Sequence, residues 1–122
     1  MTRVAVGIIR NNGKFLLCQR KKGSRYGLKW EFPGGAVEFG DTLENTIIRE
    51  MMEEFDIEIE IIDTLGVCKI INGEPRILEP HKSSKIGWFT LSELAGMKTS
   101  AVTAERIGAI KKKYPDDLPD FY

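Results

Sequence analysis

Short runs of apolar residues in the first part of the chain predict strands separated by turns. Residues 4–9 are apolar and largely β-branched, which favours one strand. Residues 11–13, Asn-Asn-Gly, favour a hairpin turn because Asn and Gly tolerate a positive φ. Residues 14–19 are then the returning strand. A third short strand is predicted at residues 30–32, ended by Pro-Gly-Gly at 33–35.

A helical repeat replaces the strand pattern after this point. Asp41 or Thr42 can cap the first free N–H groups of a helix, which is predicted to end near Asp56. Apolar residues at spacings of three, four and one predict an inward face made of Leu43, Ile47, Ile48, Met51 and Phe55.

The rest of the chain predicts more strands and one further helix. Val102, Ile107 and Ile110 are expected on the inward face of that helix. The predicted elements are strands at 57–62, 64–71 and 86–90, a turn at 72–75, a helix at 99–114 and an extended coil at 115–122.

Composition indicates one globular domain spanning residues 1–122, because 42% of the residues are hydrophobic and 30% are charged. Eighteen basic and eighteen acidic residues balance, which argues against a nucleic-acid polymer or a membrane surface as partner. No apolar run is long enough to span a membrane. Cys18 and Cys68 lie in apolar runs and are predicted to be buried free thiols, so a cytoplasmic location is expected.

Three glutamates on the first predicted helix indicate chemistry. Glu50, Glu53 and Glu54 stand at positions i, i+3 and i+4, so they share one helix face. Carboxylates so close together repel one another unless a cation lies among them. Hard oxygen ligands favour Mg²⁺ or Mn²⁺, ions that also bind phosphate oxygens. The alternative is a solvated acidic face on a surface helix, since Glu favours helices.

Residues 35–57 resemble the Nudix, or MutT-like, box, whose pattern is G-x5-E-x7-R-E-U-x-E-E-x-G-U with U an aliphatic residue. Every spacing matches. Asp41 replaces the usual Glu and keeps the charge on a shorter side chain. Asp56 replaces the usual Gly, so it would have to adopt the left-handed conformation itself. The likeness extends over residues 4–94.

The resemblance implies an α/β fold, the Nudix α/β/α sandwich, with a mixed sheet between helices. Only 21 residues separate Ile57 from Glu79, which implies a shortened hairpin after the box. A shortened hairpin could leave a strand edge exposed, and a homodimer partner could cover it.

The resemblance also implies roles for the residues of the box. The expected metal ligands are the carbonyl of Gly34 and the carboxylates of Glu50, Glu53 and Glu54, with Mg²⁺ or Mn²⁺ as cofactor. Glu53 or Glu54 is the expected general base, with Glu50 as a third candidate. Arg49 is expected to hold the ligands by pairing with Glu53 or Asp41.

Four residues outside the helix are substrate-binding candidates by the same resemblance, each with a plain structural alternative. Arg20 would reach the phosphates or the base, or be solvated. Trp30 and Phe32 would line the base pocket, while core packing is the alternative for Trp30. Glu79 would supply an added metal ligand or base from the opposite side of the cleft, or be an ordinary loop carboxylate.

The implied activity is hydrolysis of a nucleoside triphosphate to the monophosphate and pyrophosphate, as in MutT-like housecleaning of damaged nucleotides. One alternative is an ADP-ribose or other nucleoside diphosphate-linked substrate. The ADP-ribose type tends to carry a proline some fifteen residues beyond Asp56, where this chain has Ile71 and Asn72. A second alternative is a non-catalytic nucleotide-binding module. Such modules usually lose box carboxylates that this chain keeps.

Overall fold

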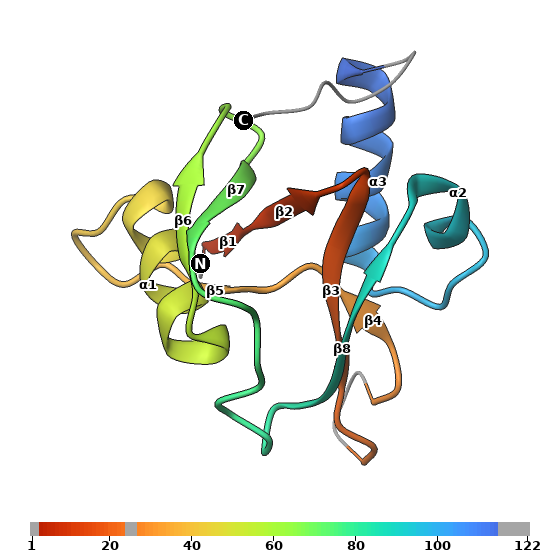
Figure 1. Cartoon of the computed structure of the whole chain (residues 1–122), viewed down its shortest axis with the longest axis horizontal. Helices are drawn as coiled ribbons and strands as arrows, with labels where there is room; N and C mark the ends of the chain where they lie inside the picture. The colour runs from red at the N-terminus through yellow and green to blue at the C-terminus, as the bar shows by residue number, and fades with distance from the viewer. Residues whose placement is uncertain (1–2, 24–26, 115–122) are drawn as a thin grey trace.

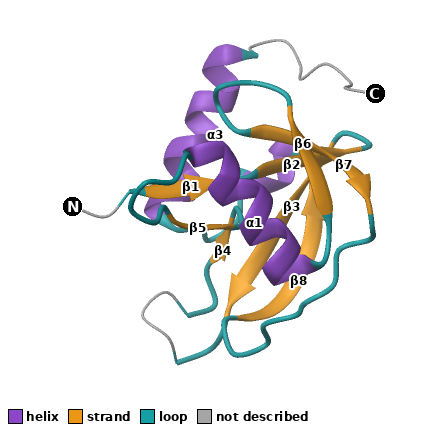
Figure 2. Cartoon of the chain, turned by 90° about the vertical axis from the view of Figure 1, so that its left-hand side faces the viewer, coloured by secondary structure: helices purple, strands orange, loops and turns teal. Residues whose placement is uncertain are grey.

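Helices cover both faces of a mixed β-sheet in the computed structural model of the chain, which describes residues 3–23 and 27–114 (Figure 1). Helix α1 (Leu43–Phe55) and helix α3 (Ala101–Lys113) lie on opposite sides of the strands, as the second view also shows (Figure 2). A short helix, α2 (Leu91–Leu94), precedes α3. The arrangement confirms the α/β sandwich predicted from the sequence.

The strands form two sheets. They are β1 (Val4–Val6), β2 (Ile8–Asn11), β3 (Lys14–Arg20), β4 (Trp30–Glu31), β5 (Gly34–Ala36), β6 (Glu58–Ile61), β7 (Val67–Asn72) and β8 (Ser83–Phe89). Strands β1 and β5 pair antiparallel. The larger sheet runs in the order β4-β3-β2-β7-β6, with β8 also paired to β3. It is mixed because β2 and β7 run parallel while the other pairs are antiparallel.

The predicted strand over residues 4–9 is wrong in one respect, because it breaks at Gly7 into β1 and β2. The Gly7 N–H donates to the Pro33 carbonyl over 2.8 Å, and the two halves join different sheets. Gly34 and Gly35, predicted to end a strand together with Pro33, instead belong to β5, which pairs with β1. A Cβ on Gly34 would lie 2.1 Å from the Ala5 carbonyl oxygen, so this close pairing requires glycine.

Two hydrophobic clusters fill the space on either side of the sheet. One lies under α1 and includes Met51, Phe55 and Cys68; the other lies under α2 and α3 and includes Phe15, Phe32 and Ile110. Cys18 and Cys68 are both buried and free, as predicted. Burial raises the pKa of each thiol to about 12, so both behave as small apolar side chains.

Helix α1 begins and ends as the sequence predicts. The Thr42 side chain accepts a hydrogen bond from the Asn45 N–H, and Asp56 adopts the left-handed conformation at φ 57° and ψ 40°. Ile47, Met51 and Phe55 are buried. Leu43 and Ile48 are 38% and 42% exposed, so their predicted inward position is wrong. The helix contacts β1, β5 and β6 along a narrow stripe, and these two side chains lie outside it.

The C-terminal part departs from prediction mainly at its boundaries. Strand β8 begins at Ser83 rather than residue 86, and Val102 is 45% exposed rather than inward. Helix α2 was not predicted, although its capping box of Thr90 and Glu93 is a sequence signal. The short hairpin of β6 and β7 after the box is present. The predicted coil at 115–122 lies outside the described residues. None of the helices described has the length and apolar character needed to cross a membrane.

Candidate functional site

Helix α1 presents its acidic side chains beside the segment that follows β7. The Leu78 N–H donates to the Glu54 carbonyl over 2.9 Å, which fixes this segment along the end of the helix. Burial of Met51 under the helix directs the neighbouring carboxylates away from the core. Glu53 is exposed, whereas Glu54 is half-buried and the Glu50 side chain is only 14% exposed.

The Glu50 carboxylate lies directly against the backbone of β5. A Cβ on Gly35 would lie 2.6 Å from Glu50 Cδ and 2.7 Å from its Oε1, closer than real contacts allow. Glycine at position 35 therefore lets the carboxylate approach the main chain. Gly34, the predicted carbonyl ligand, is the preceding residue of the same strand.

The two half-buried carboxylates repel each other. Burial and then Glu53 raise the pKa of Glu50. Burial and then Glu50 raise the pKa of Glu54 to about 8. Two carboxylates destabilised in this way gain most from a bound cation, because the cation offsets both the burial and the repulsion.

Arg49 pairs with Asp41, one of its two predicted partners. Its guanidinium also lies 3.9 Å from Glu50 and 3.9 Å from Glu38. The hydrogen bond from the Thr42 N–H and then the Arg49 guanidinium hold the pKa of Asp41 below its usual range. Arg49 thereby links the loop before the helix to the helix itself, beside Glu50.

Glu79 lies near enough to the acidic cluster to contribute to the raised pKa of both Glu50 and Glu54. The sequence interpretation overlooked Lys82. Its N–H donates to the Glu79 carbonyl over 3.0 Å, and its ammonium lies 3.5 Å from Glu79 Oε1. No motif singles out this lysine, because only the turn at 79–82 brings it to the carboxylates.

Two predicted substrate-binding residues, Arg20 and Phe32, border one cavity of about 360 Å³ next to β5. Arg20 pairs with Glu31 over 3.2 Å. Burial raises the pKa of Glu31, and Arg20 partly offsets that rise. The cavity walls include Val4, Val6, Glu31, Gly34, Gly35, Ser100, Val102 and Thr103. Glu31, Ser100 and Thr103 come from distant segments, so spacing along the chain could not indicate them.

Trp30 does not border that cavity. Its ring packs edge-to-face against Phe89 with centroids 4.9 Å apart, in the cluster under α2 and α3. The structure thus gives Trp30 the core-packing position that the sequence left as an alternative. Phe32 is 4% exposed and packs in the same way against Phe15, while it also borders the cavity.

Within residues 3–23 and 27–114, no three carboxylate, thiol or imidazole groups converge closely enough to form a complete metal site by themselves. The predicted ligands Glu50, Glu53 and Glu54 share a face of α1 without meeting at one point. An ion held there would draw the flexible side chains together, since each glutamate has three rotatable bonds.

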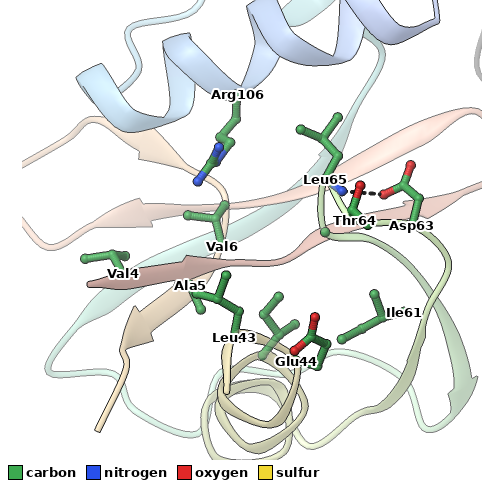
Figure 3. Close-up of a pocket in the computed structure, with 12 residues that line it drawn as sticks. Val4, Ala5, Val6, Leu43, Glu44, Ile61, Asp63, Thr64, Leu65 and Arg106 are labelled. Atoms are coloured by element: carbon green, nitrogen blue, oxygen red, sulfur yellow. Dashed lines mark hydrogen bonds between the residues drawn. The ribbon is translucent and has the colours of Figure 1, made fainter. Parts of the chain in front are cut away.

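A smaller cavity of about 90 Å³ lies between α1 and α3, and Glu50, Glu53 and Glu54 do not border it (Figure 3). Arg106 points into it from α3, and Leu43 and Glu44 border it from α1. Asp63 closes one side and accepts a hydrogen bond from the Leu65 N–H over 3.0 Å. The cavity holds no catalytic arrangement and is too small for a nucleotide.

Comparison with known proteins identifies the fold and the family. The NUDIX domain family matches residues 1–108. The 8-oxo-dGTP diphosphatase of Escherichia coli (strain K12) is 43% identical over 56 residues, which are 45% of this chain and 43% of that protein. The ADP-ribose pyrophosphatase of Methanocaldococcus jannaschii is 37% identical over 70 residues, 57% of this chain and 41% of that protein. The chain therefore matches less than half the length of either curated relative.

A solved structure agrees over a longer part of the chain. The MutT NUDIX hydrolase from Burkholderia pseudomallei superposes with a TM-score of 0.70 at 27% identity, covering 86% of this chain and 94% of that one. With the family match over residues 1–108 and the acidic cluster on α1, this agreement establishes that the chain belongs to the Nudix hydrolase family.

Proposed function

We propose that this chain hydrolyses a nucleoside triphosphate in a reaction that depends on Mg²⁺ or Mn²⁺. Water adds to one phosphorus atom, the phosphoanhydride bond between the α and β phosphates breaks, and the products are the nucleoside monophosphate and pyrophosphate. The observation that carries this proposal is the pair of half-buried carboxylates, Glu50 and Glu54, beside the glycine backbone of β5.

The residues around Glu50 fit a divalent cation. Carboxylate and carbonyl oxygens are hard ligands, and the burial and mutual repulsion of Glu50 and Glu54 are relieved by positive charge. Members of this family generally need a divalent metal ion. In the proposal Glu50, Glu53, Glu54 and the Gly34 carbonyl hold that ion. Such an ion supplies charge neutralisation for the phosphates and acidifies a bound water.

The protein's own groups have separate roles in the proposal. Glu53 or Glu54 accepts the proton of the attacking water, and Glu50 is the third candidate. Their position on the face of α1 that also carries Glu50 supports this assignment, because a base must lie within reach of the attacking water. Arg49 is a positioning residue, since its pairing with Asp41 fixes the start of α1 beside Glu50.

The cavity bordered by Arg20 and Phe32 supports a nucleobase subsite. It adjoins Gly34 and Gly35, so a base there would leave its phosphates near the carboxylates. Its walls combine apolar side chains, such as Val6 and Val102, with a few polar groups, such as Ser100. That mixture suits a planar ring with a polar edge. A contact between Trp30 and the base stays a prediction, as does a role for Glu79 in binding.

An ADP-ribose or other nucleoside diphosphate-linked substrate is the second candidate. The 37% identity to the ADP-ribose pyrophosphatase of M. jannaschii favours keeping it. Against it stands the sequence after the box, where Ile71 and Asn72 occupy the place at which the ADP-ribose type tends to carry proline. A binding module without catalysis is the third candidate, and retention of all three box carboxylates argues against it.

Two measurements test the proposal. A panel of NTPs, dNTPs, 8-oxo-dGTP and ADP-ribose is assayed for pyrophosphate and phosphate release. Pyrophosphate release from a triphosphate is expected, whereas turnover of ADP-ribose alone would favour the second candidate. The double variant Glu53→Gln, Glu54→Gln is then expected to lose metal-dependent turnover by about a hundredfold or more.

Glu44→Gln is the matched control for that variant. Glu44 lies on the same helix, is exposed, and borders the small cavity rather than the acidic cluster. Loss of the Glu44 charge should leave turnover within about twofold of wild type. Unchanged metal-dependent turnover in the double variant would contradict an enzymatic role for these carboxylates.

A reducing cytoplasm as the compartment is part of the proposal, and the two buried free thiols support it.

A further inference from the structure

We infer that Lys82 is a built-in counter-ion of the acidic cluster, which competes with the divalent cation before substrate arrives and binds the substrate's phosphates afterwards. The inference rests on the proposed function, because it assigns a residue to that same site. It concerns a lysine outside the Nudix box and outside the predicted site residues.

The turn at residues 79–82 holds Lys82 at the acidic cluster. Three backbone hydrogen bonds define the turn: Lys82 and Ser83 each donate an N–H to the Glu79 carbonyl, over 3.0 and 3.3 Å, and Lys21 donates to the Lys82 carbonyl over 3.3 Å. The Lys82 main chain is thereby tied to the end of β3. From that base its ammonium lies 3.5 Å from the Glu79 carboxylate.

Lys82 lies near the half-buried carboxylates of α1, because its turn follows Leu78, whose N–H donates to the Glu54 carbonyl over 2.9 Å. Burial and Glu53 raise the pKa of Glu50, and burial and Glu50 raise that of Glu54; in both cases Lys82 is the strongest opposing charge. Arg49 also lies 3.9 Å from Glu50, and its other guanidinium nitrogen pairs with Asp41. Lys82 is therefore placed to neutralise part of the negative charge of the cluster.

A lysine so placed must respond when a dication enters the cluster. The ammonium and a dication repel each other, so an ammonium beside the carboxylates lowers their affinity for the dication. The Lys82 side chain is 46% exposed and flexible, so the head group has free space to move into. Polyphosphate oxygens bound beside the carboxylates then offer the ammonium a new partner, and lysine suits phosphate as a mobile point charge.

When the Lys82 charge is removed, the inference predicts tighter binding of Mn²⁺ and weaker binding of the triphosphate. Lys82→Met keeps most of the side-chain volume. Without nucleotide, it is expected to bind Mn²⁺ about three- to tenfold more tightly than wild type, because the competing charge is gone. Its KM for the triphosphate is expected to rise about tenfold, with a smaller change in kcat, because a charged contact to phosphate is lost.

Two further variants are matched controls. Lys85→Met removes the same charge from β8, where Lys85 is exposed and stands opposite Gln19, away from Glu79. It should leave both affinities within about twofold of wild type. Lys82→Arg keeps the charge, so its Mn²⁺ affinity should stay close to that of wild type.

The experiment is a calorimetric or paramagnetic titration of Mn²⁺ into wild type and the three variants, followed by steady-state kinetics. Tighter Mn²⁺ binding and a higher KM in Lys82→Met alone would support the inference. Equal Mn²⁺ affinity in Lys82→Met and wild type, or equal tightening in Lys85→Met, would overturn the counter-ion role. An unchanged KM would overturn the phosphate contact. Absence of Mn²⁺ uptake by all four proteins would instead overturn the proposed function, and this inference with it.

Discussion

At the scale of single residues, the site depends on where glycine allows a side chain to approach the backbone. Gly35 is such a position, because the missing Cβ leaves room for the Glu50 carboxylate. Gly34 beside it has another purpose, since its missing Cβ allows β1 and β5 to pair. Adjacent glycines in one motif thus serve the site and the fold separately.

Gly35→Ala separates these two roles. The added Cβ would meet Glu50 Cγ, Cδ and Oε1 at 2.6 to 2.9 Å, all of them in the outer part of a flexible side chain. The side chain should therefore move while the strand stays in place. We expect kcat/KM for the triphosphate to fall about ten- to a hundredfold, because displacement of a ligand or base by an ångström is costly. Thermal unfolding should shift by no more than about 2 °C. An activity equal to wild type would show that Glu50 need not lie against this backbone.

At the scale of elements, the turn between β6 and β7 is bound to the end of α3 through Asp63. Its carboxylate accepts hydrogen bonds from the N–H groups of Leu65 and Val67, over 3.0 and 3.1 Å, and from the Tyr114 hydroxyl. Lys113 lies 3.2 Å away, and the Asp63 side chain is only 12% exposed. One carboxylate therefore connects two segments about fifty residues apart in sequence.

Asp63→Asn is expected to lower the free energy of unfolding by about 1 to 3 kcal/mol, because one oxygen becomes an amide nitrogen that cannot accept these bonds. Chemical denaturation measures the change. Asp56→Asn is the control: its pair with Arg76 is exposed, and Asn also tolerates the left-handed conformation, so its cost should be below about 1 kcal/mol. Equal costs for the two variants would contradict a special role for Asp63.

The pH dependence of this contact has a definite sign. Burial acts to raise the pKa of Asp63, but hydrogen bonds from Tyr114 and the Val67 N–H, with Lys113, outweigh it and hold the pKa below its ordinary value of 3.8. The stability that Asp63 contributes is therefore present above its unfolded pKa and is lost as the pH falls through the lower, folded value. The difference in stability between wild type and Asp63→Asn should shrink in that acidic range.

Helix α3 contains a glycine that the fold does not require. A Cβ on Gly108 would meet no atom of another element within 4 Å, and the residue lies in the helix interior. Gly108→Ala is expected to raise the free energy of unfolding by about 0.5 to 1 kcal/mol, since alanine loses less backbone entropy in a helix. Catalytic activity should be unchanged. A loss of stability would mean that α3 packs more tightly at this point than the structure indicates.

Local patterns were sufficient to predict most elements, and long-range pairing decided the rest. The cap at Thr42 and the left-handed Asp56 follow from nearby residues, and both are confirmed. The break at Gly7 and the strand at 34–36 were missed, because each depends on a partner segment about thirty residues away. Spacing along α1 predicted the wrong environment for Leu43 and Ile48 for the same reason. It shows which residues share a face, but not how wide a face the sheet covers.

The candidate site also has a part that local sequence predicts and a part that depends on contacts between distant segments. The box predicts the acidic face of α1 and the pairing of Arg49 with Asp41, because these residues lie within one helix and its cap. Lys82, Glu31 and Ser100 could not be predicted, since the sheet and the turn at 79–82 bring them in from separate parts of the chain.

At the scale of the whole molecule, the short hairpin after the box leaves β6 at one end of the larger sheet, next to β7. The homodimer expected from an exposed strand edge stays a prediction. Light scattering is expected to give about twice the 13.8 kDa of the chain, because an open edge can pair with a second copy. A mass of 13.8 kDa at high protein concentration would contradict it.

The stability of the whole protein should also depend on the charge state of the acidic cluster. Burial and then Glu50 raise the pKa of Glu54 from 4.5 to about 8, so the folded protein binds this proton more tightly than the unfolded chain does. The favourable contribution is fully present below pH 4.5 and is lost as the pH rises towards about 8. In the presence of a chelator, the melting temperature of the wild type should therefore fall as the pH rises over this range.

Glu54→Gln has no proton to lose and should remove most of that slope. Mg²⁺ or Mn²⁺ should act in the opposite direction to rising pH, because a cation bound only by the folded protein stabilises it, and by more when Glu54 is ionised. Melting curves of both proteins between about pH 5 and about pH 8, with chelator or with metal, measure the effect. A metal-free wild type whose melting temperature rises steadily over this interval, in parallel with Glu54→Gln, would show that Glu54 ionises freely. The acidic cluster would then need no cation to be stable, and the physical reason for a metal at this helix would be lost.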